Sequence, residues 1–348
     1  MRVAILCCGA MGTVMGAYLT KNGCSVELID NYQAHVDALN TGGAHIIGTV
    51  DMTVPVRAII PEQMDGTYDI VFLFTKQLAN QRVLPELLPH LREDSTVCTL
   101  QNGVPEPFVA QYVGKSRTVG GTVLWGATFH GPGVSELTQD ITKSDHLFEI
   151  GEIDGTIGPR IRAVASVLEY MGPTKVSDSL MASRWGKLVN NACMSGMSAV
   201  CGCTFGEVLD DPVSRACLSY LGREVKLCCE AEGYELPCLL GMPEPPEYLA
   251  LSDQTMFDDS QKQFLKMYDG LRPAKASMLQ DLEKGQRTEV HMINGYVCQT
   301  GDKYGIPTPF NDKVVEIVSG IEEGTLPLGK ANLELFEKAL FEYALYKV

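Results

Sequence analysis

The feature that most constrains this chain is a strand, a glycine-rich turn and a helix at its N-terminus. Arg2–Leu6 is an apolar, strand-like run, Gly9 and Gly12 follow it, and helical periodicity extends from about Met11 to Lys21. A glycine after the strand lets the backbone approach a pyrophosphate at the helix N-terminus, and the second glycine lets the helix pack closely on the strand. The order predicts a Rossmann domain that binds a dinucleotide.

An acidic residue in the right place strengthens this prediction. Asp30 closes the second predicted strand, Ser25–Ile29, about 20 residues after Gly9, where a carboxylate accepts hydrogen bonds from the ribose hydroxyls. The same carboxylate repels a 2′-phosphate, and no Lys or Arg follows directly. We therefore expect NADH to be preferred, with NADPH left open. The predicted cofactor-binding residues of this region are Cys8, Gly9, Ala10, Met11, Gly12 and Asp30.

Alternating strand and helix patterns continue through the first half of the chain. Further predicted strands are Ile70–Phe74, Thr96–Leu100, Val119–Leu124, Val134–Leu137, Leu147–Ile150 and Thr174–Val176. Predicted helical stretches are Ala34–Leu39, Gln77–Leu91 and Ile157–Tyr170. Such alternation is typical of a parallel sheet with helical crossovers. We expect an α/β domain over residues 1–177, with the turn Gly131-Pro132-Gly133 between two of its later strands.

Beyond about Ser177 the sequence predicts helices only. Helical periodicity covers Leu180–Ala199, Val213–Glu232, Ala274–Lys284, Glu289–Tyr304, Asn311–Ile321 and Asn332–Tyr346. The segment Leu239–Leu271 is the hardest to assign. We expect an all-helical domain over residues 178–348 that binds substrate.

Composition excludes several classes of partner. The chain has 348 residues and a formal charge of −15, which argues against nucleic acid or an anionic membrane as a partner. Twelve scattered cysteines do not form the framework of a small secreted protein. Cys201-Gly202-Cys203 lacks the second ligand pair of a zinc site. We expect a cytoplasmic protein that uses no metal.

Two segments of the helical half carry polar residues where a plain core would be apolar. The first contains Trp185, Lys187 and Asn191, and places the last two on one helix face. The second contains Ser277, with Glu289 twelve residues later. These segments resemble the ketopantoate reductase family, which has a W-x-K-x-x-x-N helix and an S-M-x-Q-D…T-E-x-x-x-I-N-G stretch. The resemblance extends over almost the full length of the chain.

The resemblance implies that a hydride passes from the nicotinamide to the ketone carbon of a small 2-oxo acid. Lys187 would donate a proton to the keto oxygen, and Glu289 would orient Lys187. An ammonium suits this role because negative charge develops on that oxygen. The resemblance further implies substrate binding by Asn102, Asn191, Ser195 and Ser277, and cofactor contacts from Lys76 and Asn102.

Departures from the family pattern leave the substrate open. Ser195 and Ala274 occupy positions where the family usually has asparagine, and Trp125–Val134 resembles the NAD-linked D-2-hydroxyacid (D-mandelate-type) branch. Ketopantoate and a branched or aromatic 2-oxo acid are therefore both candidates. A 3-hydroxyacid-type dehydrogenase is a weaker alternative, because the S-M-x-Q-D…T-E stretch disfavours it. A non-catalytic nucleotide sensor is weaker as well, since Lys187 and Glu289 are both present. We also expect that the helical domains could pair in a homodimer.

Overall fold

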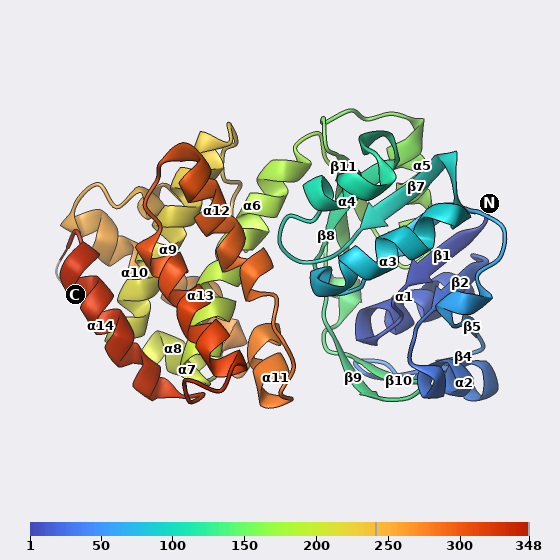
Figure 1. The fold of residues 1–348 in the computed structure, drawn as a ribbon, viewed down its shortest axis with the longest axis horizontal. Helices are drawn as coiled ribbons and strands as arrows, with labels where there is room; N and C mark the ends of the chain where they lie inside the picture. The colour runs from blue at the N-terminus through green and yellow to red at the C-terminus, as the bar shows by residue number, and fades with distance from the viewer. Residues whose placement is uncertain (241, 347–348) are drawn as a thin grey trace. The chain divides into compact units, whose positions relative to one another are not determined.

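The chain folds into an α/β unit followed by an all-helical unit, as the sequence predicts. The computed structural model describes residues 1–240 and 242–346; residue 241, in the segment that was hardest to assign, and residues 347–348 of the predicted second domain lie outside them. Its contacts define two compact units, Met1–Leu180 and Met181–Val348, and every described strand belongs to the first (Figure 1). No described helix combines the length and apolar character needed to cross a membrane.

An eight-stranded sheet forms the centre of the first unit. Its strands lie in the order β12 (Thr174–Val176), β11 (Phe148–Glu152), β8 (Thr118–Val123), β7 (Leu91–Thr99), β6 (Tyr68–Leu73), β1 (Val3–Leu6), β2 (Val26–Ile29) and β5 (Arg57–Ile59). All neighbours pair in parallel except β8 and β11. Because β1, β2 and β6 run in parallel, the loops after these three strands meet at one edge of the sheet.

Helices cover both faces of this sheet. They are α1 (Ala10–Lys21), α2 (Gln33–Gly42), α3 (Asn80–Leu87), α4 (Glu106–Val113) and α5 (Pro159–Leu168). Successive residues of β1 point to opposite faces, so Ile5 belongs to the apolar core that contains α1 and α5, and Leu6 to the core that contains α3 and α4. Both cores are closed to water, which makes β1 a rigid support for the loop that follows it.

A second, smaller sheet lies in the same unit, and the sequence revealed only part of it. Its order is β4 (Met52–Val54), β3 (Ala44–Gly48), β10 (Val134–Leu137) and β9 (Ala127–Gly131). Only β10 and the turn before it were predicted. The strands β3, β4, β5 and β9 were missed; each has five residues or fewer, a length at which periodicity alone separates strands poorly from loops.

Prolines explain two further differences. The predicted helix Gln77–Leu91 is wrong at both ends, since α3 covers only Asn80–Leu87 between two 3₁₀ turns. A proline at position 89 lacks the N–H that would continue the helix, and Leu91 already begins β7. The helix α4 was not predicted, because prolines 105 and 107 frame its start.

The second unit consists of helices. They are α6 (Leu180–Asn190), a π-helical segment (Asn191–Ser195), α7 (Gly196–Cys201), α8 (Phe205–Asp210), α9 (Pro212–Ala231), α10 (Gln254–Tyr268), α11 (Ser277–Glu283), α12 (Asn294–Tyr304), α13 (Pro309–Glu322) and α14 (Leu333–Tyr343). The single helix predicted over Leu180–Ala199 is therefore interrupted. The helix predicted from Glu289 is also wrong at its start, since a 3₁₀ turn precedes α12; α8 and α10 were not predicted.

Buried polar side chains tie this unit together near the π-helical segment. The carboxylate of Glu224 on α9 accepts hydrogen bonds from the backbone N–H groups of Phe310 and Asn311, both at 2.9 Å, and so caps the N-terminus of α13. The side-chain amide of Asn294 donates to the Asn311 side-chain oxygen at 2.9 Å and to the Ala192 carbonyl at 3.0 Å. One buried network thus joins α9, α12 and α13 to the π-helical segment.

Candidate active site

In the loop between β1 and α1, main-chain groups rather than side chains face the open surface. A side chain added at Gly9 would meet nothing within 4 Å, so the surface there is open. A side chain at Gly12 would lie 2.7 Å from the Cys7 carbonyl oxygen and 3.0 Å from the side chain of Ile5, so only glycine allows α1 to lie this close to β1. No side chain caps the N-terminus of α1. The loop therefore offers main-chain N–H groups beside open space, the arrangement that binds a pyrophosphate.

Cys7 occupies the position that the first glycine of the usual motif would take. Its φ is +70°, a left-handed conformation that favours glycine. Burial, and to a smaller extent the nearby Asp30 carboxylate, raise the pKa of the Cys7 thiol to about 11. Burial also raises the pKa of Cys8 well above its usual range. Both thiols are therefore neutral at pH 7 and poor nucleophiles.

A cavity of about 170 Å³ opens at the same edge of the sheet. Its lining includes Cys7, Asp30, Lys76 and Arg82. Asp30 is buried at the end of β2, and its carboxylate accepts a hydrogen bond from the backbone N–H of Tyr32 at 2.9 Å. No cation follows Asp30 directly in the sequence, whereas the fold brings Lys76 and Arg82 to this cavity from the segment after β6.

A buried polar network supports the loops after β6 and β7. The side-chain amide of Gln101 donates to the Thr75 carbonyl at 2.6 Å and to the side-chain oxygen of Asn80 at 2.7 Å. Thr75 and Gln101 directly precede Lys76 and Asn102. The network therefore fixes the backbone from which both predicted residues project. Sequence reasoning missed these three residues, although a polar side chain directly after a buried strand is a recognisable signal.

The helical unit brings Lys187 and Glu289 together. Trp185, Leu188 and Val189 are buried and leave the α6 face that bears Lys187 only partly exposed. Burial and, after it, the positive charge of Arg184 lower the pKa of Lys187, and the Glu289 carboxylate opposes both effects; the resulting pKa is about 7. A lysine poised near neutral pH can donate a proton and regain it.

Arg184 is the charged residue that sequence reasoning missed at this place. It is fully buried one turn before Lys187, and Glu289 is buried as well. A buried guanidinium is rare in folded proteins and needs partners. Its position three residues before Lys187 on the same helix was a usable signal, because residues at this spacing share a helix face.

The remaining predicted residues lie around the π-helical segment. Asn191 begins this segment and is partly buried, and Ser195 ends it and is buried. Ser277 is exposed at the first position of α11, a helix that packs against both the π-helical segment and α7. π-Helical turns within α-helices are frequent at functional sites. The helical unit thus gathers Lys187, Asn191, Ser195, Ser277 and Glu289 from α6, the π-helical segment, α11 and the turn before α12.

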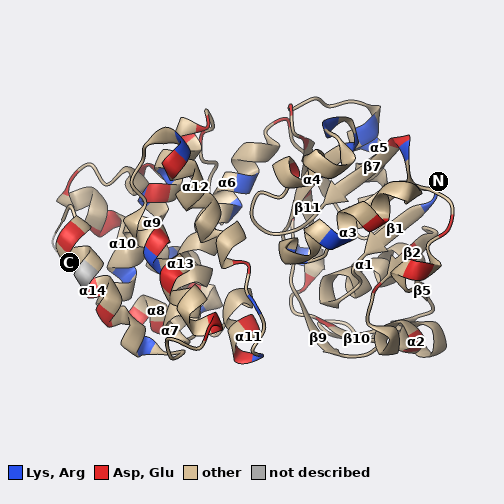
Figure 2. Cartoon of the chain, viewed as in Figure 1, with Lys and Arg blue, Asp and Glu red and all other residues tan. Residues whose placement is uncertain are grey.

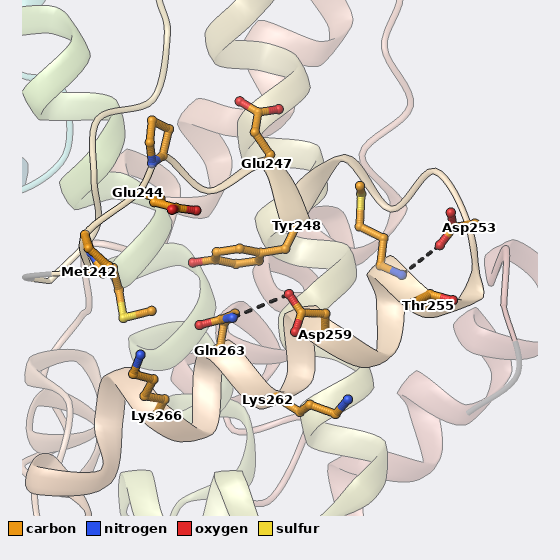
Figure 3. A pocket seen from close by; sticks show the side chains of 13 residues that line it. Met242, Glu244, Glu247, Tyr248, Asp253, Thr255, Asp259, Lys262, Gln263 and Lys266 are labelled. Carbon is orange, nitrogen blue, oxygen red and sulfur yellow. Dashed lines mark hydrogen bonds between the residues drawn. The ribbon is translucent and has the colours of Figure 1, made fainter.

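Another cavity in the helical unit contains none of the predicted residues. It has a volume of about 640 Å³ and lies between the proline-rich loop from Met242 and helix α10. Tyr248 and Gln263 point toward its centre, with Lys266 at one side (Figure 3). Both acidic and basic side chains line it, so its lining does not single out one ligand class.

Charge on the molecule is mostly acidic, and basic side chains are dispersed. The chain has 43 acidic and 28 basic residues, and Figure 2 shows Lys and Arg scattered among Asp and Glu in both units. An anionic substrate therefore depends on local cations. In the helical unit, Arg184 and Lys187 supply such cations next to the predicted substrate-binding residues.

The glycine loop at the edge of a parallel sheet, together with a helical unit that holds a lysine–carboxylate pair, defines a two-domain oxidoreductase. Two family models match the chain: "Ketopantoate reductase PanE/ApbA" over residues 3–153 and "Ketopantoate reductase PanE/ApbA C terminal" over residues 179–322. Together they span most of its length. The chain belongs to the ketopantoate reductase family.

Individual relatives agree with this assignment. The chain is 28% identical over 330 residues to a 2-dehydropantoate 2-reductase of Archaeoglobus fulgidus, covering 93% of this chain and 98% of the relative. It is 26% identical over 325 residues to the enzyme of that name from Streptococcus pyogenes serotype M1, covering 92% and 98%. The matched region thus includes almost the whole length of both relatives.

Solved structures show the same fold. A 2-dehydropantoate 2-reductase from Geobacter metallireducens is 25% identical, with a TM-score of 0.75 and coverage of 92% of this chain and 99% of that chain. D-mandelate dehydrogenase in a ternary structure with NADH and anilino(oxo)acetate has a TM-score of 0.78 at 23% identity, with coverage of 93% and 99%. The second likeness concerns the fold alone.

Proposed function

We propose that this protein reduces 2-dehydropantoate to pantoate with a nicotinamide cofactor, as its curated relatives are named to do. The observation that carries the proposal is the partly buried Lys187, whose pKa is lowered to about 7 next to the buried carboxylate of Glu289. Family membership supplies the reaction class, and this pair supplies the proton that the reduction of a ketone needs.

The chain's own residues have distinct roles in this proposal. A reduced nicotinamide, when bound, supplies the hydride. Lys187 hydrogen-bonds the keto oxygen of the substrate and donates its proton as negative charge develops there. Glu289 favours the ammonium form of Lys187 and orients it. Burial, together with the charge of Arg184, keeps the pKa of Lys187 low enough for the proton to leave near neutral pH.

The other predicted residues complete the two binding sites. We assign Asn102, Asn191, Ser195 and Ser277 to the substrate. We assign Cys8, Gly9, Ala10, Met11, Gly12, Asp30, Lys76 and Asn102 to the cofactor. The open surface at Gly9 and the cavity beside Asp30 fit such a ligand. In this proposal residues 1–177 bind the cofactor, and residues 178–348 bind the substrate.

We further propose that NADH is preferred over NADPH. Asp30 stands where the ribose hydroxyls would bind, and a carboxylate there repels a 2′-phosphate. Lys76 and Arg82 line the same cavity and act in the opposite direction. Because Asp30 is buried at the end of its strand, solvent and salt screen its charge less than they screen the charges of Lys76 and Arg82.

A second candidate substrate follows from the departures in the substrate region. Ser195 is buried at the end of the π-helical segment, and both Ser195 and Ala274 are smaller than the asparagines usual in the family. Fewer amides and more space favour a branched or aromatic 2-oxo acid. The reaction would then be that of a D-2-hydroxyacid dehydrogenase.

The proposal also includes a cytoplasmic location and pairing into a homodimer. The twelve cysteines are all thiols and none forms a disulfide with another described residue, which supports a reducing compartment such as the cytoplasm. Phe341, Tyr343 and Leu345 expose large apolar side chains at the C-terminal end of the chain, which supports pairing into a homodimer. Light scattering of the purified protein measures the second point directly.

The test is steady-state cofactor oxidation by the purified protein, with 2-dehydropantoate, a branched 2-oxo acid and an aromatic 2-oxo acid, each run with NADH and with NADPH. We expect the highest kcat/KM with 2-dehydropantoate and NADH. A higher kcat/KM with an aromatic or branched substrate would replace the first candidate by the second. No turnover of any 2-oxo acid, in a protein that binds NADH, would contradict both.

A further inference from the structure

Two buried side chains hold the backbone of the glycine loop from behind. The carbonyl oxygen of Cys8 accepts hydrogen bonds from the hydroxyl of Thr13 and from Nε2 of His35, the latter at 2.8 Å. Both side chains are inaccessible to solvent. Nδ1 of His35 accepts a hydrogen bond from the backbone N–H of Gly133 at 2.9 Å, which leaves Nε2 as the nitrogen that donates to the Cys8 carbonyl.

The anchored carbonyl fixes the direction of the next N–H group. In a trans peptide the C=O and N–H bonds point in opposite directions, and the chain has no described cis peptide. The Cys8 carbonyl points into the protein, so the N–H of Gly9 points away from it, toward the sulfur of Cys7. Cys7 lines the cavity next to Asp30. Sulfur is a weak acceptor, so an anion bound at this loop would replace it as the partner of the Gly9 N–H.

His35 also connects this loop to the second sheet. Gly133 lies in the turn between β9 and β10, and the ring of Phe129 on β9 meets the imidazole edge-on with 5.1 Å between ring centres. The β9–β10 hairpin thus holds His35 in one orientation, and His35 holds the Cys8–Gly9 peptide. The rigid hairpin reduces the entropy that the loop would lose on binding a ligand.

We propose that Thr13 and His35 are positioning residues for the cofactor, which keep the Gly9 N–H aimed at its pyrophosphate. This inference rests on the proposed function, because it takes the β1–α1 loop as the dinucleotide site. Neither residue touches the cofactor; both act through the Cys8–Gly9 peptide. The ligand class is therefore a dinucleotide or another anion with a phosphate at this loop.

The experiment compares NADH binding and steady-state kinetics in Thr13→Val, His35→Leu and the wild-type chain. Thr13→Val keeps the shape and removes the hydroxyl, Thr13→Ser restores a donor, and Thr20→Val is the matched control. Thr20 lies on the same helix, and its buried hydroxyl has no hydrogen-bond partner. The measured quantities are the Kd of NADH from fluorescence, KM and kcat, and the Tm of the free protein.

We expect Thr13→Val and His35→Leu to raise the Kd and KM of NADH by about 3- to 10-fold, the effect of one typical hydrogen bond. At saturating NADH, kcat should stay unchanged. Thr13→Ser and Thr20→Val should bind NADH like the wild type. A purely structural role would lower Tm without this separation of KM from kcat.

Two results would overturn the inference in different ways. If the wild type binds NADH and Thr13→Val binds it equally well, the positioning role is wrong while the proposed function stands. If the wild type binds neither NADH nor NADPH, the proposed function fails and the positioning role fails with it. Should His35→Leu not fold, Thr13→Val alone decides between these results.

Discussion

The two units build their candidate sites from different parts of the polypeptide. In the α/β unit the loop after β1 offers main-chain groups, and its glycines matter because they have no side chain. In the helical unit the chemistry depends on the side chain of Lys187, whose pKa is set by burial, Arg184 and Glu289. Ligand binding at the backbone site should therefore be sensitive to side-chain atoms added at its glycines. Catalysis at the side-chain site should instead be sensitive to the loss of a single charged group.

The largest expected effect tests the side-chain site. Lys187→Ala should lower kcat about 10²- to 10⁴-fold, the usual contribution of a general acid, because no other group then protonates the keto oxygen. The Kd of NADH should not change. Lys303→Ala, which removes a surface lysine paired with Glu232, is the control. A Lys187→Ala protein that differs from the wild type only in KM would contradict the assignment.

The next test separates two glycines of the backbone site. Gly9→Ala should raise the Kd of NADH at least about tenfold, a cost of about 1.4 kcal/mol, and leave Tm nearly unchanged, because the added methyl group meets only open space. Gly12→Ala should weaken binding as well and also destabilise the free protein by about 1–3 kcal/mol through overpacking. Calorimetric titration and thermal unfolding measure both quantities. Equal Tm values for the two variants would contradict the packing argument.

Asp30 tests the one side chain of the first unit to which we assign specificity. Asp30→Ala removes the charge that repels a 2′-phosphate and the acceptor for the ribose hydroxyls. The ratio of kcat/KM with NADH to kcat/KM with NADPH should fall by about tenfold or more, as expected for hydrogen bonds to a charged group. Glu86→Ala, at the rim of the same cavity, should leave the ratio unchanged. An unaltered ratio in Asp30→Ala would contradict the assignment of the NADH preference to Asp30.

A smaller effect concerns pH. Reduction needs protonated Lys187, and its pKa is lowered to about 7, so kcat/KM for reduction should fall as pH rises above that value. In the oxidation direction it should rise, because Lys187 must then accept a proton. Glu289→Gln removes the charge that raises this pKa, so its profile should shift to lower pH. Glu283→Gln, an exposed residue paired with Lys275, should not shift the profile; an unshifted profile in Glu289→Gln would show that the two residues do not interact.

The smallest effect is expected at Cys7. Its φ of +70° is unfavourable for a residue with a side chain, so Cys7→Gly should relieve strain. Glycine is also more flexible in the unfolded chain, and the net gain in the free energy of unfolding should be below about 1 kcal/mol. Cys7→Val should lower Tm clearly, since a β-branched residue tolerates this conformation least. A lower Tm for Cys7→Gly than for the wild type would mean that the thiol contributes more than the strain costs.

Much of the first unit could be predicted because its signals are local. The strand, glycine and helix order from Arg2 to Lys21 and the place of Asp30 follow from backbone geometry over short stretches of chain. The strands β3, β4 and β9 of the second sheet could not be predicted, since this sheet forms only when β3 pairs with β10, which lies far away in the sequence. The interruption of the helix at Asn191 could not be predicted either, because residues with ordinary helical propensity fill the π-helical segment.

By itself, the sequence determined the α/β order, the glycine positions and the identity of the residues able to carry the chemistry. Only the tertiary structure decided that the charge of Arg184 acts on Lys187, that Gln101 holds the loops bearing Lys76 and Asn102, and that His35 supports the glycine loop. Burial and charge interactions depend on distances between residues far apart in the chain. Periodicity and spacing record only which residues are neighbours along it.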